Sequence, residues 1–168
     1  MSRPPASERD LLHVRALPYR MGVGIMLLNA DGAVLIGHRV DMKSEAWQMP
    51  QGGIDAGETP EQALWRELQE EVGTAKATIL ARARDWISYD FPAELQARVW
   101  DGRFRGQSQM WFLLRFTGVD ADLALDTHER EFSETRWVAT AELPDMVVGF
   151  KRDTYRSVLT EFAAHLRS

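Results

Sequence analysis

The sequence predicts an α/β fold in which a mixed β-sheet is covered by helices on both faces. Two observations favour this class. Short apolar stretches typical of strands alternate along the chain with two segments that are expected to be helical, one from its capping signals and one from its apolar spacing. A chain of 168 residues that is 45% hydrophobic and 27% charged is also long enough to bury one core. We therefore expect one layered domain.

Composition limits both the location and the partners of this protein. We expect a flexible arm over residues 1–18, where prolines and charges prevail, followed by one domain over residues 19–168. The chain has no cysteine and no apolar run long enough to cross a bilayer, so a cytoplasmic protein without a membrane partner is expected. A net charge of -5 and a pI near 5.4 argue against a protein that coats nucleic acid. They do not argue against a polyphosphate ligand, because bound metals and a few arginines can reverse the sign inside a cleft.

The first half of the expected domain begins with a hairpin. Asp31-Gly32 is a strong turn signal between two apolar runs. The polar residues that follow indicate a loop, and a short strand then leads to a glycine pair. We expect strands at Met21–Asn29, Ala33–Arg39 and Trp47–Gln51, with a loop at Val40–Ala46.

A helix is predicted over Pro60–Val72 from the signals at its two ends. Thr59 has the side chain of an N-cap, Pro60 suits the first helical position, and Gln62 completes a capping box. Gly73 supplies the stop at the C-terminal end. A loop that is rich in glycine therefore runs directly into a helix.

The second half of the domain is expected to return to strands before a final helix. Apolar residues near the C-terminus repeat at helical spacing, at Tyr155, Val158, Leu159, Phe162 and Leu166. The expected elements are strands at Thr78–Ile87, Ser108–Thr117 and Thr135–Thr140, a long loop at Phe91–Gly106, and a helix at Phe150–Leu166.

Three glutamates of the predicted helix are the first candidates for chemistry. Glu67, Glu70 and Glu71 are spaced i, i+3 and i+4, which brings their carboxylates onto one helical face within reach of a common point. Such like charges repel one another, and hard divalent cations prefer oxygen ligands, so Mg²⁺ or Mn²⁺ is the expected partner. The alternative is an acidic amphipathic helix whose carboxylates only face solvent.

The segment from Gly52 to Thr74 resembles the signature of the Nudix hydrolases, G-x5-E-x7-R-E-U-x-E-E-x-G-U with U an aliphatic residue. The matching positions are Gly52, Glu58, Arg66, Glu67, Leu68, Glu70, Glu71 and Gly73. Only the last position departs, because Thr74 replaces an aliphatic residue. The resemblance implies the Nudix α/β/α sandwich with a mixed central sheet, and hydrolysis of a phosphoanhydride bond.

Further segments resemble one branch of that family, the bacterial RNA pyrophosphohydrolases, which also includes dinucleoside polyphosphate hydrolases. The resemblance extends from Leu17 to Phe162, with local departures between Arg39 and Trp47 and in Gly106–Met110. The similar segments are Leu17–Arg20, Trp47–Gly53, Gly106-Gln107, Trp111–Leu114, Glu131-Phe132, Arg136–Val138 and Phe150–Asp153.

The resemblance implies a set of metal ligands. Glu67, Glu70 and Glu71 would bind the cation together with the backbone carbonyl of Gly52. Glu131 matches a distant glutamate that completes the site, either as a further ligand or as the general base. Which of Glu67, Glu71 and Glu131 takes the proton from water stays open, as does the number of metal ions.

Two further acidic or basic positions have expected roles beside these ligands. Arg66 should point to the other side of the helix from Glu67 and orient the carboxylates through a bidentate pair, with Glu58 as its structural partner. For Glu131 the alternative is a solvated loop acid in the run that also contains Glu129 and Glu134.

The same resemblance implies the contacts to substrate. Phosphates would meet two arginines, a tyrosine and a lysine would line the polyphosphate path, and two apolar residues would hold a base. These residues are Arg20, Arg39, Tyr89, Lys151, Val148 and Phe150. The alternatives are a core position for Phe150 and solvated charges for Arg20 and Lys151.

Three functions remain open from the sequence. The first is an RNA pyrophosphohydrolase that acts on the 5′-triphosphate end of RNA and so starts transcript decay, and the second is a hydrolase of dinucleoside polyphosphates such as diadenosine tetra- or pentaphosphate. The third, a non-catalytic binding module, is disfavoured because the glutamate set is intact. The preferred 5′ nucleotide, the oligomeric state and any stimulating protein partner are not indicated by the sequence.

Overall fold

The structure, a computed structural model, describes residues 8–39, 47–124 and 132–166. Within these ranges the strands form one eight-stranded sheet. They are β1 (Tyr19–Leu28), β2 (Val34–Arg39), β3 (Trp47–Gln48), β4 (Gln51–Gly53), β5 (Ala77–Arg82), β6 (Ile87–Asp90), β7 (Gly106–Phe116) and β8 (Phe132–Val138).

The sheet is mixed, as predicted. Its path runs β3-β2-β1-β7-β5, with β4 beside β1, β6 beside β7 and β8 beside β2. The two longest strands, β1 and β7, are parallel neighbours over their whole length, so Tyr19 lies opposite Gly106 and Leu28 opposite Arg115. All other pairings are antiparallel, including the predicted hairpin of β1 and β2.

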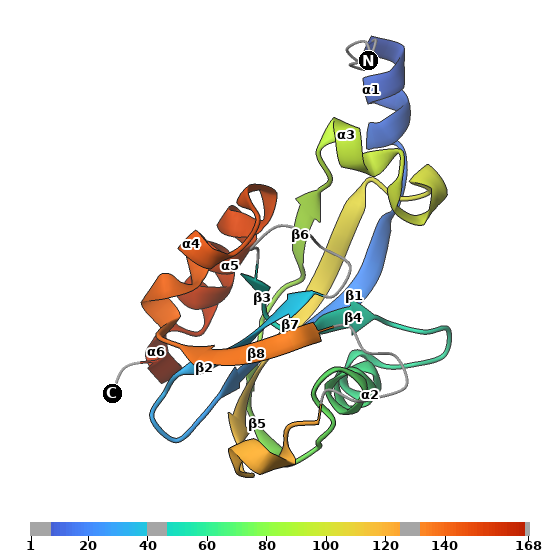
Figure 1. Cartoon of the computed structure of the whole chain (residues 1–168). Helices are drawn as coiled ribbons and strands as arrows, with labels where there is room; N and C mark the ends of the chain where they lie inside the picture. Colours follow the sequence, from blue (N-terminus) through green and yellow to red (C-terminus); the bar gives the residue numbers. More distant parts are fainter. Residues whose placement is uncertain (1–7, 40–46, 125–131, 167–168) are drawn as a thin grey trace.

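Helices cover both faces of this sheet, which confirms the predicted fold class. In Figure 1, α2 lies on one side, and α4, α5 and α6 lie together on the other. The helices are α1 (Glu8–Arg15), α2 (Pro60–Val72), α3 (Ala93–Gln96), α4 (Leu143–Met146), α5 (Arg152–Glu161) and α6 (Ala163–Leu166). Across the described ranges, none of them is both long and apolar enough to span a membrane.

The core fills both spaces between the sheet and its covering helices. Leu64 and Leu68 of α2 are fully buried on one side, and Val158 of α5 is fully buried on the other. Trp111 of β7 is also inaccessible, and its ring meets that of Tyr155 edge-on at 5.9 Å. Because β7 is covered on both faces, its apolar residues form a nearly continuous run and not an alternating one.

Two segments that were expected to be irregular contain helices. Helix α1 lies within the predicted arm, and Arg105 donates a 3.0 Å hydrogen bond to the Arg15 carbonyl at its C-terminal end. Helix α3 lies within the predicted loop Phe91–Gly106, where the Gln96 N–H reaches the Pro92 carbonyl at 2.9 Å. Both helices are too short to leave a periodic apolar pattern in the sequence.

The predicted strand Trp47–Gln51 is two strands with different partners. β3 pairs with β2, whereas β4 pairs with β1. The chain changes partner at Met49-Pro50, because proline has no N–H to donate to the sheet and the Met49 N–H donates instead to the Tyr155 hydroxyl at 2.7 Å.

The predicted strand Thr78–Ile87 is likewise divided, into β5 and β6. Both pieces pair with β7. Between them, the Arg84 N–H donates to the Glu161 carboxylate at 2.9 Å and not to a neighbouring strand. A side chain from the end of α5 therefore satisfies the backbone N–H where the strand breaks.

The remaining predicted elements differ in their bounds. β8 begins earlier than the predicted Thr135–Thr140 and pairs along β2. The predicted helix Phe150–Leu166 starts with a 3-10 turn and continues as α5 and α6, which meet at Phe162. The predicted loop Val40–Ala46 lies outside the described residues.

Candidate active site

A cavity of about 730 Å³ brings together residues from both halves of the chain. Among its lining residues are three positions of the signature helix and loop, Gly52, Glu67 and Glu70, and the side chain of Arg66. All six predicted substrate contacts line it as well, namely Arg20, Arg39, Tyr89, Val148, Phe150 and Lys151. Two of the predicted acidic ligands, Glu67 and Glu70, thus line the same cavity as the predicted cationic residues.

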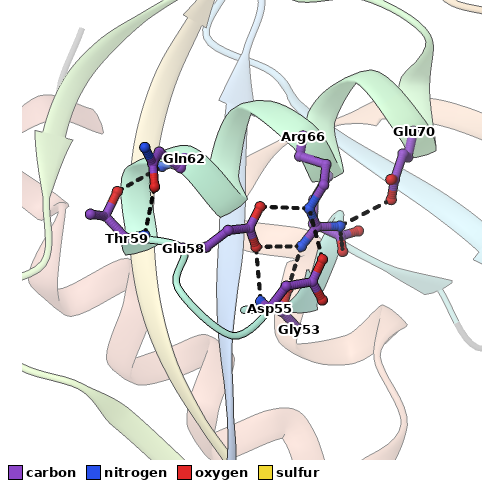
Figure 2. A network of polar contacts seen from close by, with 8 residues as sticks. Gly53, Asp55, Glu58, Thr59, Gln62, Arg66 and Glu70 are labelled. Carbon is purple, nitrogen blue, oxygen red and sulfur yellow. Dashed lines mark hydrogen bonds and ion pairs between the residues drawn. The ribbon is translucent and has the colours of Figure 1, made fainter.

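Helix α2 has the ends that its sequence predicts. The Thr59 hydroxyl accepts a hydrogen bond from the Gln62 N–H at 3.2 Å, and the Gln62 side chain accepts one from the Thr59 N–H at 2.9 Å (Figure 2). Gly73 ends the helix in the left-handed conformation, at φ 75°. Both ends are fixed locally, so the glutamates between them have defined positions along the helix.

Strand β4 lies directly against the signature glutamates. A side chain on Gly52 would overlap the Glu67 carboxylate, so this close approach requires glycine. The N–H of Gln51 donates to Glu71 at 3.1 Å. Two glutamates of α2 therefore contact consecutive residues of β4.

Arg66 is the centre of the polar network drawn in Figure 2. Its Nε and Nη2 form a bidentate pair with Glu58, at 2.7 and 2.8 Å, and Nη2 also donates to the Gly53 carbonyl at 2.8 Å. Its Nη1 donates to Glu67 at 2.8 Å and to Glu70 at 3.2 Å. One guanidinium thus ties the loop to two of the predicted metal ligands.

These contacts confirm the expected pair of Arg66 with Glu58 but correct the expected direction of Arg66. Instead of pointing away from Glu67, the long side chain curls back so that Nη1 reaches its carboxylate. The guanidinium holds the pKa of Glu58 well below its usual range, at about 2, with help from the Asp55 N–H. The same carboxylates raise the pKa of Arg66, against the effect of burial.

Different hydrogen-bond donors contact the three signature carboxylates. In the described part of the chain, no three His, Cys, Asp or Glu side chains are grouped as a metal site. Arg66 holds Glu67 and Glu70, while the backbone of Gln51 holds Glu71 on the buried side of the helix. Helical spacing sets the positions of the Cα atoms, and tertiary contacts such as these influence where the carboxylates lie.

The donor set nevertheless suits a hard divalent cation. Arg66 carries one positive charge and faces four carboxylates, those of Asp55, Glu58, Glu67 and Glu70. The candidate ligands offer oxygen atoms only, as Mg²⁺ prefers. Because the local charge is strongly negative, binding a divalent cation would relieve repulsion among these groups.

Another part of the cavity lining carries a row of side chains whose order follows from the strand register. Arg20 of β1 lies opposite Gln107 of β7, and Gln107 lies opposite Tyr89 of β6. Gln107 donates to the Tyr89 hydroxyl at 2.6 Å and accepts a long hydrogen bond from Arg20 at 3.4 Å. Burial raises the pKa of Tyr89 to about 12, so its hydroxyl stays neutral.

Lys151 is a buried cation and not the solvated charge that was considered from the sequence. Its exposed fraction is 7%. Its Nζ donates to Gln48 at 3.4 Å and lies 5.6 Å from the centre of the Tyr89 ring. Burial lowers the pKa of Lys151 to about 8, with a further decrease from Arg39 and an opposing effect from Glu71.

The predicted base-binding residues lie at the start of the last helical region. Phe150 packs on Tyr89 with ring centres 5.9 Å apart and lines the cavity together with Val148. Phe150 is therefore a wall residue, which speaks against the alternative of a fully buried core position. Glu131, the distant candidate ligand or base, lies outside the described residues, and its role stays a prediction.

Several lining residues were not singled out as site candidates from the sequence. Gln51 and Gln107 are buried amides within the network, and Gln109 donates to Gln51 at 3.0 Å. Phe91 and Trp100 form part of the wall from the segment that was expected to be a loop. The position of Gln107 and Gln109 at the start of a strand that becomes apolar was the one available signal, because a buried amide requires hydrogen-bond partners.

Comparison with known proteins decides the family. The family profile described as NUDIX domain matches residues 18–158. The chain belongs to the Nudix family. The match includes β1, the signature loop and helix, and most of α5, so it spans both walls of the cavity.

Bacterial Nudix relatives named RNA pyrophosphohydrolase resemble the chain over nearly its whole length. The protein from Rhodospirillum rubrum is 54% identical over 152 residues, which cover 90% of this chain and 92% of that protein. The protein from Rickettsia bellii is 52% identical over 147 residues, which cover 88% of this chain and 91% of that protein. These identities agree with the branch of the family that the sequence motifs indicated.

Solved structures of other hydrolases share the fold. The dihydroneopterin triphosphate pyrophosphohydrolase of E. coli aligns with a TM-score of 0.64 and 19% identity, over 85% of this chain and 98% of that chain. The Ap4A hydrolase of C. elegans, in a binary complex, aligns with a TM-score of 0.59 and 17% identity, with the same coverage. At such identities the likeness concerns the fold alone.

Proposed function

We propose that this protein is a metal-dependent RNA pyrophosphohydrolase, which removes pyrophosphate from the 5′-triphosphate end of RNA and leaves a monophosphate. The observation that carries this proposal is the cavity itself. Its lining includes Glu67 and Glu70 of α2, the cations Arg20, Arg39 and Lys151, and the apolar side chains of Val148 and Phe150. The relatives that bear this enzyme name at about half identity support the same conclusion.

The acidic wall would hold the cation. Glu67, Glu70, Glu71 and the Gly52 carbonyl are the proposed ligands, with Mg²⁺ or Mn²⁺ as the ion and Glu131 as a further ligand or the base. When bound, such an ion neutralises phosphate charge and makes coordinated water more acidic. Arg66 holds the Glu67 and Glu70 carboxylates, which would supply oxygen ligands to such an ion.

The cationic wall would hold the phosphate chain. Arg20, Arg39 and Lys151 supply the positive charge, and the neutral Tyr89 hydroxyl and the amide of Gln107 supply polar groups beside them. Phe150 and Val148 would pack on the base of the nucleotide that follows the 5′ end, because stacking on an aromatic ring tolerates any base. Water then attacks phosphorus, the anhydride bond breaks, and one of Glu67, Glu71 and Glu131 accepts the proton.

A substrate panel tests this function. Purified protein in Mg²⁺ is given 5′-triphosphate RNA, diadenosine tetraphosphate and free nucleoside triphosphates, and the products are separated by chromatography. We expect pyrophosphate and 5′-monophosphate RNA from the first substrate. Rapid cleavage of the dinucleotide without any release from RNA would replace the RNA function with that of a dinucleoside polyphosphate hydrolase.

The cellular role follows from the proposed product. We propose that the enzyme works in the cytoplasm and starts messenger RNA decay, because a 5′-monophosphate end differs in charge from the original triphosphate end. Deleting the gene should lengthen the half-lives of triphosphorylated transcripts. If half-lives in the deletion strain are unchanged while the purified enzyme is fully active, the role in messenger RNA decay is refuted and the hydrolysis activity is not.

A further inference from the structure

The cavity wall includes an aromatic residue in an unusual backbone conformation. Trp100 has φ 46° and ψ 44°, and the next residue, Asp101, has φ 56° and ψ 29°. Both are left-handed although neither is glycine, and Gly102 follows at φ 71°. Residues with a Cβ adopt this region at a cost, so their surroundings must enforce it.

The surroundings of Trp100 fix the orientation of its ring. The indole packs against Phe91 and Phe104, with ring centres 5.7 and 6.1 Å apart. The buried side chain of Gln96 fastens the same turn by donating to the carbonyls of Gly102 and Phe104, at 3.0 and 3.2 Å. Contacts within residues 91–104 therefore hold the indole ring in place.

The ring faces one of the cations of the cavity. The Arg20 guanidinium carbon lies 4.3 Å from the centre of the Trp100 ring, which is a close cation–π contact. A side chain on Gly53 would come within 2.7 Å of the same carbon, so the guanidinium also lies against the backbone of β4. Arg20 also donates a long hydrogen bond to Gln107 of β7, at 3.4 Å. The Trp100 turn, β4 and β7 thus all restrict the Arg20 side chain.

We propose that Trp100 is a positioning residue, which fixes the Arg20 guanidinium for the phosphate chain of the substrate. This role rests on the proposed hydrolysis of polyphosphates and deepens it. A guanidinium that is already ordered loses less conformational freedom when it binds phosphate. Trp100 acts through Arg20 and touches no reacting atom, so its loss affects substrate binding more than the chemical step.

Two matched variants test whether the aromatic face matters. Trp100→Leu keeps an apolar side chain without a π face, whereas Trp100→Phe keeps the face. With 5′-triphosphate RNA and Mg²⁺, we expect the leucine variant to raise KM by roughly five- to thirty-fold, with kcat within about threefold. The phenylalanine variant should stay within about threefold of the native KM. A residue that only supports the fold would not distinguish the two in this way.

A double-mutant cycle with Arg20→Met tests whether Trp100 affects KM through Arg20. In the Arg20→Met background, Trp100→Leu should change KM by less than about twofold, because its target is gone. An equal effect in both backgrounds overturns the positioning role and assigns direct contact with substrate. A fall in kcat alone, or equal losses in the leucine and phenylalanine variants, overturns it as well.

Controls separate this role from folding and from the choice of substrate. Asp101→Gly relieves the left-handed conformation and leaves the ring, so it should raise the melting temperature without changing KM. If the leucine variant does not fold, Trp100→Met takes its place in the cycle. If the native protein cleaves dinucleoside polyphosphates and not RNA, the RNA function fails, and the same cycle on that substrate decides the role of Trp100.

Discussion

Replacing Lys151 by methionine should stabilise the protein and weaken its binding of substrate. Lys151 is 7% exposed, and burial is the largest cause that lowers its pKa from the ordinary 10.5 to about 8. Each tenfold change in proton affinity corresponds to about 1.4 kcal/mol, so the buried charge costs roughly 3 kcal/mol. Methionine has a similar length and no charge, and we expect the free energy of unfolding to rise by about 1–3 kcal/mol at pH 7.

The pH dependence of stability provides the sharper assay. The pKa of Lys151 is lower in the folded state, about 8, than the ordinary 10.5, so the unfolded chain holds more protons between these values. The cost is complete below about pH 8 and disappears as the pH rises toward 10.5. The advantage of the methionine variant, measured by urea unfolding in metal-free buffer, should therefore shrink across this interval.

Kinetics and a charge-retaining control complete this test. Lys151→Met should lower kcat/KM for triphosphate RNA by roughly 10- to 100-fold, because a charge-assisted contact to phosphate is lost. Lys151→Arg keeps its charge at every accessible pH and should show no such rise in stability above pH 8. A methionine variant that is less stable than the native protein at pH 7, with unchanged kinetics, would refute the assignment of Lys151 as a buried, phosphate-facing cation.

Three other substitutions test the acidic wall and its support. Glu70→Gln should lower kcat/KM by roughly 100-fold, because it removes a proposed metal ligand. Glu61→Gln, at an exposed position on the same helix, should leave kcat/KM unchanged. Equal activity of the two variants would contradict the metal assignment. Arg66→Lys loses the bidentate geometry and should reduce activity about tenfold, whereas near-native activity would show that charge alone suffices. Tyr155→Phe removes the hydroxyl that accepts the Met49 N–H at 2.7 Å. The free energy of unfolding, measured in urea, should fall by about 1–3 kcal/mol. A decrease smaller than the error of that measurement would contradict this hydrogen bond.

The helix that carries the glutamates could be predicted to the residue, because its signals are local. The structure gives Pro60–Val72, with Thr59 and Gly73 in the capping roles that their side chains predict. A capping box and a left-handed glycine involve only neighbours along the chain, so no tertiary information is needed. The family followed from the same segment, because its signature consists of fixed spacings.

The direction and burial of individual side chains could not be predicted in this way. Arg66 was expected to face away from Glu67, since neighbours in a helix diverge, but its side chain is long enough to return to that carboxylate. Lys151 follows a phenylalanine and was considered as a surface charge, yet the packing of β3 and β6 buries it. The direction and burial of a side chain depend on contacts with residues that are distant in sequence, and a single sequence does not show which distant residues meet.

The division of charge within the cavity links metal binding to substrate binding. In the proposed function, Glu67 and Glu70 on α2 would repel a polyphosphate that Arg20 and Lys151 would attract, and all four residues line one cavity. A divalent ion at the acidic wall removes that repulsion, and by thermodynamic reciprocity the bound polyphosphate must strengthen the binding of the ion to the same degree. The proposed site would therefore be complete only when ion and substrate are bound together. The chain builds this dependence from the register of β1, β6 and β7 on one wall and from the capped helix α2 on the other.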